Sequence, residues 1–292
     1  MDTSRESFFK YIKYEKRFSV HTLTAYTGDL DQFFLYLSDT YEINEVLSID
    51  HTIIRSWIVQ LMENGISART VNRKITTLKT FFKFLLRQES ISVDPMLKIQ
   101  GPKTPKRLPV FVDKQSMDML LDEIPFPEGK EGDLGRLIID LLYSTGMRLS
   151  ELINLKQTDV DIPASQLKVL GKRNKERIIP FNSSLGEQLL RYMNEKETMQ
   201  NEFLLVDEKG KKLYPKFVYR LVNSYLSQVT TVNKKSPHIL RHTFATHMLN
   251  NGADLNSIKE LLGHASLAAT QVYTHNTVEK LKSIHKQAHP KA

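Results

Sequence analysis

The sequence predicts a mainly α-helical protein with a small β-sheet, made of an N-terminal helical bundle and a C-terminal α+β domain. Apolar residues recur at helical spacing through the first hundred positions. Four prolines then fall within residues 94–109, which excludes a regular helix there. Since 292 residues are enough for two domains of ~100–200 residues each, we expect domains at residues 1–100 and 111–292, joined by a linker at residues 101–110.

Four amphipathic helices are expected in the N-terminal domain. Ser19 and Ser67 occupy positions that suit helix N-caps, and Gly65 follows the third apolar pattern as a helix stop. Four groups of apolar residues at helical spacing define the helices: Phe8, Tyr11 and Ile12; Leu23, Tyr26, Leu30, Phe33, Phe34 and Leu37; Ile53, Ile54, Trp57, Ile58, Leu61 and Met62; Val71, Ile75, Leu78, Phe82 and Leu85.

The fourth of these helices is strongly basic outside its apolar stripe. Its cations are Arg69, Arg73, Lys74, Lys79, Lys83 and Arg87. Such a face can simply be solvated, or the helix can enter a DNA groove while its outer residues grip phosphates. On charge and placement alone, Arg69, Arg73 and Lys74 are the candidates for DNA binding.

The C-terminal domain is expected to combine helices with a short hairpin. Helical patterns cover about residues 113–123 and 133–145. Two β-type runs follow, Gln166–Leu170 and Arg177–Pro180, joined by a polar turn that contains glycine and asparagine. Helices then dominate, and one of them, Leu255–Leu262, ends at a glycine.

Composition and charge narrow the possible classes of protein. Without cysteine, the chain has no disulfide, thiol nucleophile or cysteine-ligated zinc. No apolar run reaches the ~20 residues needed to cross a bilayer, and no signal peptide is recognisable, so we expect a cytoplasmic protein without membrane contact. The net charge of +8 includes two basic stretches, residues 51–100 and 201–250, each with eight basic and three acidic residues. These stretches favour a polyanionic partner.

The first candidate site lies at the start of a helix. Ser236 and Pro237 suit the N-cap and the first position of that helix. His238 and Arg241, three residues apart, then share one face near the positive end of the helix dipole, where an anion binds readily. As a lone motif, a surface histidine and arginine at this spacing are also common without a function.

Further candidates lie along the C-terminal domain. Arg148 and Glu151 are one helical turn apart, either as a structural ion pair or as a carboxylate that holds a functional guanidinium in place. Lys172 lies in the turn between the two β runs, where a basic residue is most often just solvated. His264 follows a helix that ends at a glycine, and Tyr273 lies nine residues beyond it.

Together these residue types suit the cleavage of a phosphodiester. Two arginines supply planar forks for the non-bridging oxygens and offset the charge that grows at phosphorus. Two histidines can donate to those oxygens or accept a proton near neutral pH, and a lysine can protonate the leaving 5′ oxygen. A tyrosine becomes a nucleophile once its proton has an acceptor and its anion lies beside cations. The six residues are Arg148, Lys172, His238, Arg241, His264 and Tyr273.

In this order, the six residues resemble the signature of the tyrosine recombinases, the lambda-integrase family, and within it of the Xer proteins. The signature is Arg, Lys, His-x-x-Arg, His or Trp, Tyr. The resemblance covers nearly the whole chain, and residues 1–100 resemble the family's SAM-like core-binding domain. The matching segments are Thr-Gly-x-Arg-x-Ser-Glu-Leu, Gly-Lys-x-Asn-Lys-Glu-Arg, Pro-His-x-Leu-Arg-His-x-Phe-Ala-Thr-His, Leu-Gly-His-x-Ser and Thr-x-x-Tyr-Thr-His.

The resemblance implies a site-specific recombinase that closes as a clamp around double-stranded DNA. Tyr273 would form a 3′-phosphotyrosine link, and strands would be exchanged through a Holliday junction without metal or ATP. Four protomers would assemble on two duplexes, as a homotetramer or with a second recombinase. The last helix, Thr277 to about Lys286, would dock on a neighbouring protomer.

The implied biological role is the resolution of chromosome or plasmid dimers, with a DNA-translocating division protein as a further partner. One residue departs from the family's pattern. The lysine turn usually reads Gly-Lys-Gly, whereas Arg173 stands here in place of the second glycine. If that second glycine needs a positive φ, Arg173 changes the geometry of the turn that carries Lys172, the expected proton donor.

Other interpretations share part of this evidence. An integrase of a mobile element would carry the same residues, and type IB topoisomerases attack a phosphodiester with a similar set but relax supercoils as monomers. A repressor that only binds DNA fits less well, because every nucleophile and cation position is filled. His238 and His242 have the spacing of a zinc motif, but the glutamate of His-Glu-x-x-His is missing, so we expect no metal and no other cofactor.

Overall fold

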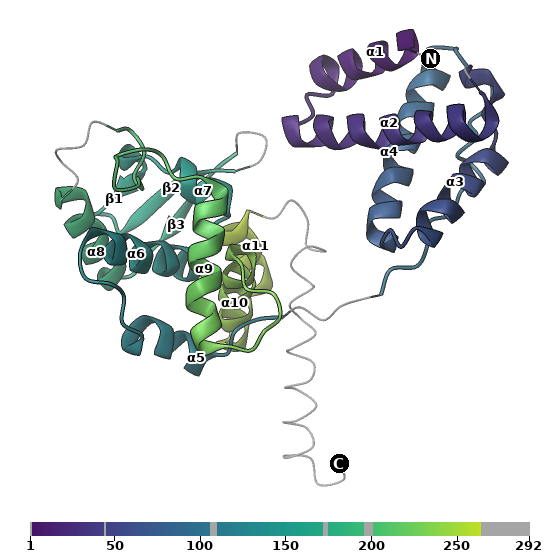
Figure 1. Cartoon of the computed structure of the whole chain (residues 1–292). Coiled ribbons are helices and arrows are strands. Elements are labelled where there is room, and N and C mark those ends of the chain that lie inside the picture. The colour runs from purple at the N-terminus through teal and green to yellow at the C-terminus, as the bar shows by residue number, and fades with distance from the viewer. Residues whose placement is uncertain (1, 44, 106–109, 172–174, 196–200, 264–292) are drawn as a thin grey trace, which may run out of the picture. The chain divides into compact units, whose positions relative to one another are not determined.

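The computed structural model describes residues 2–43, 45–105, 110–171, 175–195 and 201–263 (Figure 1). The chain forms two compact units, Met1–Lys106 and Arg107–Ala292. Both units are mainly helical, and the second adds one small sheet, so the predicted fold class is confirmed. Across the described residues, no helix has the length and apolar character that a membrane span requires.

The N-terminal unit consists of helices alone. Ser19 and Ser67 cap α2 and α4 as predicted, because each hydroxyl accepts a hydrogen bond from the backbone N–H three residues later. Asp50 caps α3 in the same way, which the apolar pattern did not indicate. The elements are α1 (Asp2–Lys10), a π-helical turn (Tyr11–Glu15), α2 (Val20–Tyr41), a 3₁₀ turn (Val46–Ser48), α3 (His51–Glu63) and α4 (Ala68–Arg87).

Aromatic side chains fill the core of this unit. Phe33 and Trp57 pack with their ring centroids 4.9 Å apart, and Phe8 meets Phe81 edge-on at 5.2 Å. The start of the proline-rich segment also belongs to this core, since Ile91, Met96 and Ile99 are buried in it. The side chain of Asn72 on α4 donates a hydrogen bond of 2.8 Å to the carbonyl of Pro102. Residues 91–102 are therefore packed against the bundle, which their proline content did not predict.

The C-terminal unit places helices around a three-stranded antiparallel sheet in the order β1-β2-β3. The predicted hairpin is confirmed, with Leu167 opposite Ile179 and Val169 opposite Arg177. The two-residue strand β1 was not predicted, because two residues carry no alternating pattern. The elements are α5 (Lys114–Asp118), a π-helical turn (Met119–Glu123), α6 (Lys130–Thr145), α7 (Leu149–Asn154), a 3₁₀ turn (Gln157–Asp159), β1 (Val160–Asp161), β2 (Gln166–Leu170), β3 (Glu176–Pro180), α8 (Ser183–Glu195), α9 (Pro215–Val229), α10 (Pro237–Asn250) and α11 (Leu255–Leu262).

Helix α6 is the central element of this unit. It contacts α8, α9 and α10, and its apolar residues from Leu134 to Leu142 are buried (Figure 1). It ends at Gly146, whose φ of 59° lies in the left-handed region. A Cβ at this position would lie 2.4 Å from the ring of Phe244 on α10, so only glycine fits. This close approach brings the end of α6 against α10.

Helices α10 and α11 begin and end where the sequence indicates. Ser236 and Pro237 are the N-cap and first residue of α10, although the Ser236 hydroxyl makes no capping hydrogen bond. Helix α11 covers Leu255–Leu262 and ends at Gly263 with a left-handed φ of 63°. The two helices contact each other, and Ile258 and Leu262 pack with Phe244 in a small separate core.

Candidate active site

Arg148 and Glu151 form a compact unit at the start of α7. One carboxylate oxygen, Oε2, accepts the backbone N–H of Arg148 at 2.8 Å. The other, Oε1, accepts Nη1 of the Arg148 guanidinium at 2.6 Å. Glu151 therefore caps the helix, which the sequence did not indicate, and also forms the expected ion pair that holds the guanidinium. The Arg148 side chain retains 24% of its exposure, which leaves the guanidinium accessible.

Arg241 and Arg148 both bind near the end of α11. Arg241 is buried on α10 and donates from Nη1 to the carbonyl of Gly146 at 2.7 Å and from Nη2 to the carbonyl of Leu262 at 2.6 Å. Arg148 donates from Nη2 to the carbonyl of Gly263 at 3.0 Å. These bonds hold the two arginines of the predicted set at one place, although they are 93 positions apart in the sequence.

A third arginine, Arg177 on β3, completes this network and was not among the predicted site residues. Its Nη1 and Nη2 donate to the two oxygens of Glu151 at 2.9 and 2.8 Å. Its Nε donates to the carbonyl of Leu261 at 2.6 Å. The only indication of Arg177 in the sequence was its place as the last residue of the family-like segment Gly-Lys-x-Asn-Lys-Glu-Arg.

The last carbonyls of α11 are thus bound by guanidinium groups. Leu261, Leu262 and Gly263 accept from Arg177, Arg241 and Arg148 respectively. These carbonyls lack partners within a helix and carry its negative dipole end, so cations stabilise them. The arrangement fixes the backbone immediately before residue 264.

Among the described residues, this centre holds three guanidiniums, of Arg148, Arg177 and Arg241, and one carboxylate, that of Glu151, which pairs with Arg148 and Arg177. Its charge is therefore net positive. Burial raises the pKa of Glu151, but hydrogen bonds and charge from Arg177 and Arg148 outweigh it and hold the pKa below its ordinary value. Glu151 therefore stays ionised at neutral pH. A net positive, partly exposed centre of this kind suits an anionic group such as a phosphate.

His238 lies beside the two predicted arginines on the first turn of α10. Burial of part of its ring, together with the charges of Arg241 and Arg148, lowers its pKa below 6.5. The imidazole is therefore neutral at pH 7 and able to accept a proton. Its ring packs edge-on against His242 at 4.3 Å. Across the described residues, no three histidine, aspartate or glutamate side chains gather as a metal site.

Three of the six signature residues fall outside the described residues. They are Lys172, His264 and Tyr273. Arg173, the departure from the family's pattern, also falls outside them. The described ends of the lysine turn are joined by a hydrogen bond of 2.8 Å from the Gly171 N–H to the Lys175 carbonyl. The structure thus brings together Arg148, Arg241, His238 and Glu151 and leaves the other assignments as proposals.

The candidates for DNA binding on α4 occupy different environments. Arg69 is exposed, whereas Lys74 is 7% exposed and donates to the buried carboxylate of Asp29 at 2.9 Å. Arg73 pairs with the same carboxylate, and Thr77 donates to it at 2.8 Å. The ammonium of Lys74 is therefore engaged inside the bundle. The sequence held a signal of this burial, because Lys74 lies three residues after Val71 and four before Leu78, on the same face of the helix as the apolar stripe.

The exposed face of α4 borders an open groove of about 730 Å³, which we call the α4 groove. Among the described residues, no acidic side chain lines it. Its lining includes four cations, namely Lys79, Lys83 and Arg87 from α4 and Lys16 from the segment before α2. The groove is lined by Tyr11, Lys16, Phe18, Thr76, Lys79, Thr80, Lys83, Phe84, Leu86 and Arg87. This surface has the charge and the mixture of cations with hydroxyl and aromatic groups that phosphate backbones require.

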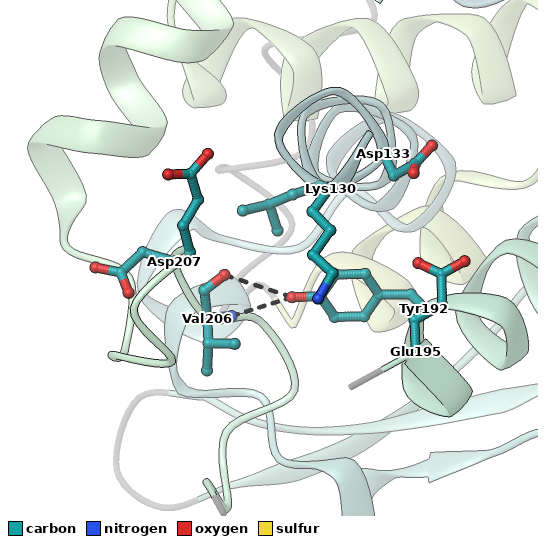
Figure 2. Close-up of a pocket in the computed structure, with 8 residues that line it drawn as sticks. Lys130, Asp133, Tyr192, Glu195, Val206 and Asp207 are labelled. Carbon is teal, nitrogen blue, oxygen red and sulfur yellow. Dashed lines mark hydrogen bonds between the residues drawn. The ribbon is translucent and has the colours of Figure 1, made fainter. Parts of the chain in front are cut away.

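A second hollow, in the C-terminal unit, has the opposite character (Figure 2). It measures about 40 Å³ and is lined by Lys130, Asp133, Leu134, Tyr192, Glu195, Val206, Asp207 and Glu208. Its acidic rim and small size suit no phosphate. The Tyr192 hydroxyl donates to the carbonyl of Val206 at 3.4 Å and accepts its N–H at 3.2 Å, so it ties α8 to the following loop. None of the three described signature residues, Arg148, His238 and Arg241, lines it.

Comparison with known proteins identifies two family regions. The profile of the Phage integrase family matches residues 112–280, more than half of the chain. The profile of the Phage integrase N-terminal SAM-like domain matches residues 6–89. The tyrosine recombinase XerC of Staphylococcus epidermidis is 38% identical over 295 residues, which cover the whole of this chain and 99% of that protein. XerC of Chlorobaculum tepidum is 36% identical and covers 98% of this chain and 94% of that protein.

Solved structures of recombinases share the fold. The site-specific recombinase XerH, bound to a palindromic difH substrate in a post-cleavage complex, aligns with a TM-score of 0.79 and 25% identity over 95% of this chain and 83% of that one. A lambda integrase dimer bound to a core site aligns with a TM-score of 0.72 over 94% of each chain, and its 17% identity shows the fold alone. The chain therefore belongs to the phage integrase family, as a Xer-type tyrosine recombinase, an enzyme of site-specific recombination.

Proposed function

We propose that this enzyme cleaves and rejoins double-stranded DNA at a specific site through a 3′-phosphotyrosine link formed by Tyr273. The observation that carries the proposal is the placement of Arg148 and Arg241 at the end of α11 with His238 beside them. A phosphodiester carries one negative charge and gains more in the transition state, and this centre is net positive. Glu151 holds Arg148 in place without contact with the DNA.

The proposed roles follow from the chemistry of each group. The guanidiniums of Arg148 and Arg241 bind the non-bridging oxygens of the scissile phosphate. The phenol oxygen of Tyr273 attacks phosphorus as its proton passes to an acceptor such as the neutral His238, and the bond to the 5′ oxygen breaks. Lys172 protonates that leaving oxygen, and His264 donates a hydrogen bond to the phosphate. The new ester retains the energy of the broken bond, so a second 5′ hydroxyl can reverse the step without metal or ATP.

The DNA partner is supported by both units. XerH is bound to DNA in its solved complex, and we extend DNA binding to this chain. In the N-terminal unit, the α4 groove is the proposed surface for the phosphate backbone, with Arg69 on the same helix. Affinity that depends on such cations falls as salt rises, because binding releases counterions from the DNA. The two units together are proposed to close as a clamp around the duplex.

We extend the proposal to the assembly on the basis of family membership. Four protomers, as a homotetramer or with a second recombinase, would exchange strands in pairs through a Holliday junction. The expected last helix, Thr277 to about Lys286, which lies outside the described residues, would join neighbouring protomers. The process served would be the resolution of chromosome or plasmid dimers, with a DNA-translocating division protein as regulator.

The proposal is tested by trapping the covalent intermediate. The protein is incubated with nicked fragments of the source chromosome, so that the short strand beside a cleavage point diffuses away, and then denatured and run on a gel. We expect wild type to form a protein–DNA adduct in excess EDTA and Tyr273→Phe to form none while it binds DNA as tightly. Tyr219→Phe, at an exposed tyrosine on α9, is the matched control and keeps the adduct. An equal yield from Tyr273→Phe would overturn the proposal.

A further inference from the structure

We propose that Arg177 is a positioning residue for the cleavage step. It shares the carboxylate of Glu151 with Arg148, so that Arg148 stays available to the scissile phosphate. This inference rests on the proposed function. Arg177 itself does not meet the DNA, because its side chain is only 12% exposed and its three nitrogens are all engaged. Its influence passes through Glu151 and through the end of α11.

The carboxylate of Glu151 is shared between two arginines. Oε1 accepts Nη1 of Arg148 at 2.6 Å and Nη1 of Arg177 at 2.9 Å. Oε2 accepts the backbone N–H of Arg148 and Nη2 of Arg177, both at 2.8 Å. Arg148 thus pairs with the carboxylate through one guanidinium nitrogen, while its Nη2 turns to the Gly263 carbonyl. Because the Arg177 guanidinium also binds the carboxylate, the Arg148 guanidinium makes only one hydrogen bond to it.

The consequence of losing Arg177 follows from the burial of the carboxylate. Glu151 has a side-chain exposure of 3%, so it cannot turn to water when one partner is removed. Arg148 is the cation that remains in reach, and a planar guanidinium prefers two parallel bonds to a carboxylate. Arg148 would therefore rotate onto Glu151 with both nitrogens and leave the Gly263 carbonyl. That rotation withdraws its fork from the proposed phosphate position.

Arg177 also joins three parts of the site that are distant in sequence. It lies on β3, beside the turn that carries Lys172, and its Nη1 is 3.6 Å from the position of a Cβ on Gly171. Its Nε holds the Leu261 carbonyl, and its Cδ is 3.2 Å from the position of a Cβ on Gly263. One side chain therefore sets the turn, the carboxylate and the segment before His264 relative to each other. A lysine has no fork that could reproduce three divergent bonds.

The test measures the rate of adduct formation at saturating nicked DNA separately from the affinity for intact DNA. The variants are Arg177→Met, which keeps side-chain length without charge, and Arg177→Lys. The matched control is Arg191→Met on α8, at an exposed arginine outside the network. We expect Arg177→Met to lower the saturating rate ~100-fold, the effect that a displacement of about 1 Å produces, while Kd stays within roughly threefold. Arg177→Lys should recover only part of the rate, and the control should equal wild type.

A second variant separates positioning from mere support of the fold. Arg177→Met combined with Glu151→Gln removes both buried charges, so Arg148 is no longer drawn onto a carboxylate. Per mole of folded protein, we expect the double variant to react faster than Arg177→Met alone, whereas a purely structural role would change the folded fraction and leave the rate of the folded protein unchanged. It also remains informative if Arg177→Met does not fold, because it leaves no unpaired buried charge.

The outcomes distinguish this inference from the function on which it rests. An adduct formed equally fast by wild type and Arg177→Met overturns the inference alone. The inference is also overturned if the folded double variant reacts no faster than Arg177→Met. If Arg177→Met is unfolded, the comparison is with Arg177→Lys, and a double variant that reacts no faster than Arg177→Lys overturns the inference. Absence of any adduct from wild type overturns the proposed function and this inference together.

Discussion

His238 is the residue whose charge state links the site to pH. Burial of part of its ring, with the charges of Arg241 and Arg148, lowers its pKa below 6.5, so it is neutral at pH 7. As the pH falls through that lowered pKa, the ring gains a proton and can no longer accept one. We predict that the single-turnover adduct rate is level near neutral pH and declines with a midpoint below 6.5. His238→Gln should be slower and lack this decline.

This pH profile is measured with saturating nicked DNA between about pH 5 and 8, the range in which histidines titrate. His51→Gln, at a histidine in the N-terminal unit, serves as control and should retain the wild-type profile. A decline that persists unchanged in His238→Gln would assign the titration to another group.

Lys74 illustrates how one residue type can serve structure rather than binding. Its ammonium satisfies the Asp29 carboxylate inside the bundle, where an uncompensated charge is strongly destabilising. We predict that Lys74→Met lowers the free energy of unfolding by about 2–3 kcal/mol, less than the full effect of breaking a buried pair because Arg73 and Thr77 still contact the carboxylate. Arg69→Met, at an exposed position, should change it by no more than about 0.5 kcal/mol.

Urea denaturation followed by circular dichroism measures both variants. Equal stability of Lys74→Met and wild type would show that the buried pair contributes nothing to the bundle. A loss of DNA affinity without a loss of stability would return Lys74 to the candidates for direct DNA contact.

At the scale of elements, helix α4 separates two functions by its two faces. One face packs into the aromatic core, and the other carries Lys79 and Lys83 on the α4 groove. If these lysines contact phosphates, each accounts for roughly one unit of the slope of log K against log salt. We therefore predict that Lys79→Met with Lys83→Met reduces that slope by about 1–2.

The matched control for this double variant removes two exposed cations of the same unit that lie outside the groove, Lys10→Met with Lys98→Met. Its slope should remain near that of wild type. Both slopes are obtained from fluorescence anisotropy titrations of a labelled duplex over a series of salt concentrations. Equal slopes for the two double variants would place the phosphate contacts elsewhere.

Element ends, more than element interiors, set the geometry of the site. Gly146 ends α6, and its carbonyl accepts a hydrogen bond from Arg241. Gly263 ends α11, and its carbonyl accepts a hydrogen bond from Arg148. The sequence predicted the stop at Gly263, because glycine adopts the left-handed conformation that ends a helix. It did not predict that the carbonyls of Gly146 and Gly263 would be bound by arginines, since these bonds join residues 95 and 115 positions apart.

At the scale of the whole molecule, local chemistry was the part that the sequence predicted well. Helix caps such as Ser19 and Ser67, the hairpin and the end of α11 depend on residues close together in the chain, so spacing alone revealed them. Features that depend on distant segments were missed. Arg177 meets Glu151 and Leu261 across 26 and 84 positions, and no periodic pattern records such contacts.

The sequence placed residues 91–99 in the N-terminal domain but did not show that they pack in its core, for a related reason. Prolines indicate the absence of a helix, but they do not show whether the irregular segment lies in solvent or against a core. Met96 and Ile99 are apolar, and the N-terminal core takes them in. Composition alone therefore excluded a regular helix from residue 94 onwards and did not reveal this packing.

The central claim is that the phenol oxygen of Tyr273 becomes joined to the 3′ phosphate of a cleaved strand. The most direct measurement is mass spectrometry of the tryptic peptide that remains bound to DNA after denaturation of the trapped adduct. The account predicts a nucleotide mass on the peptide containing Tyr273, with the adduct formed equally well in excess EDTA. A nucleotide on any other residue, or cleavage that requires added magnesium, would contradict it.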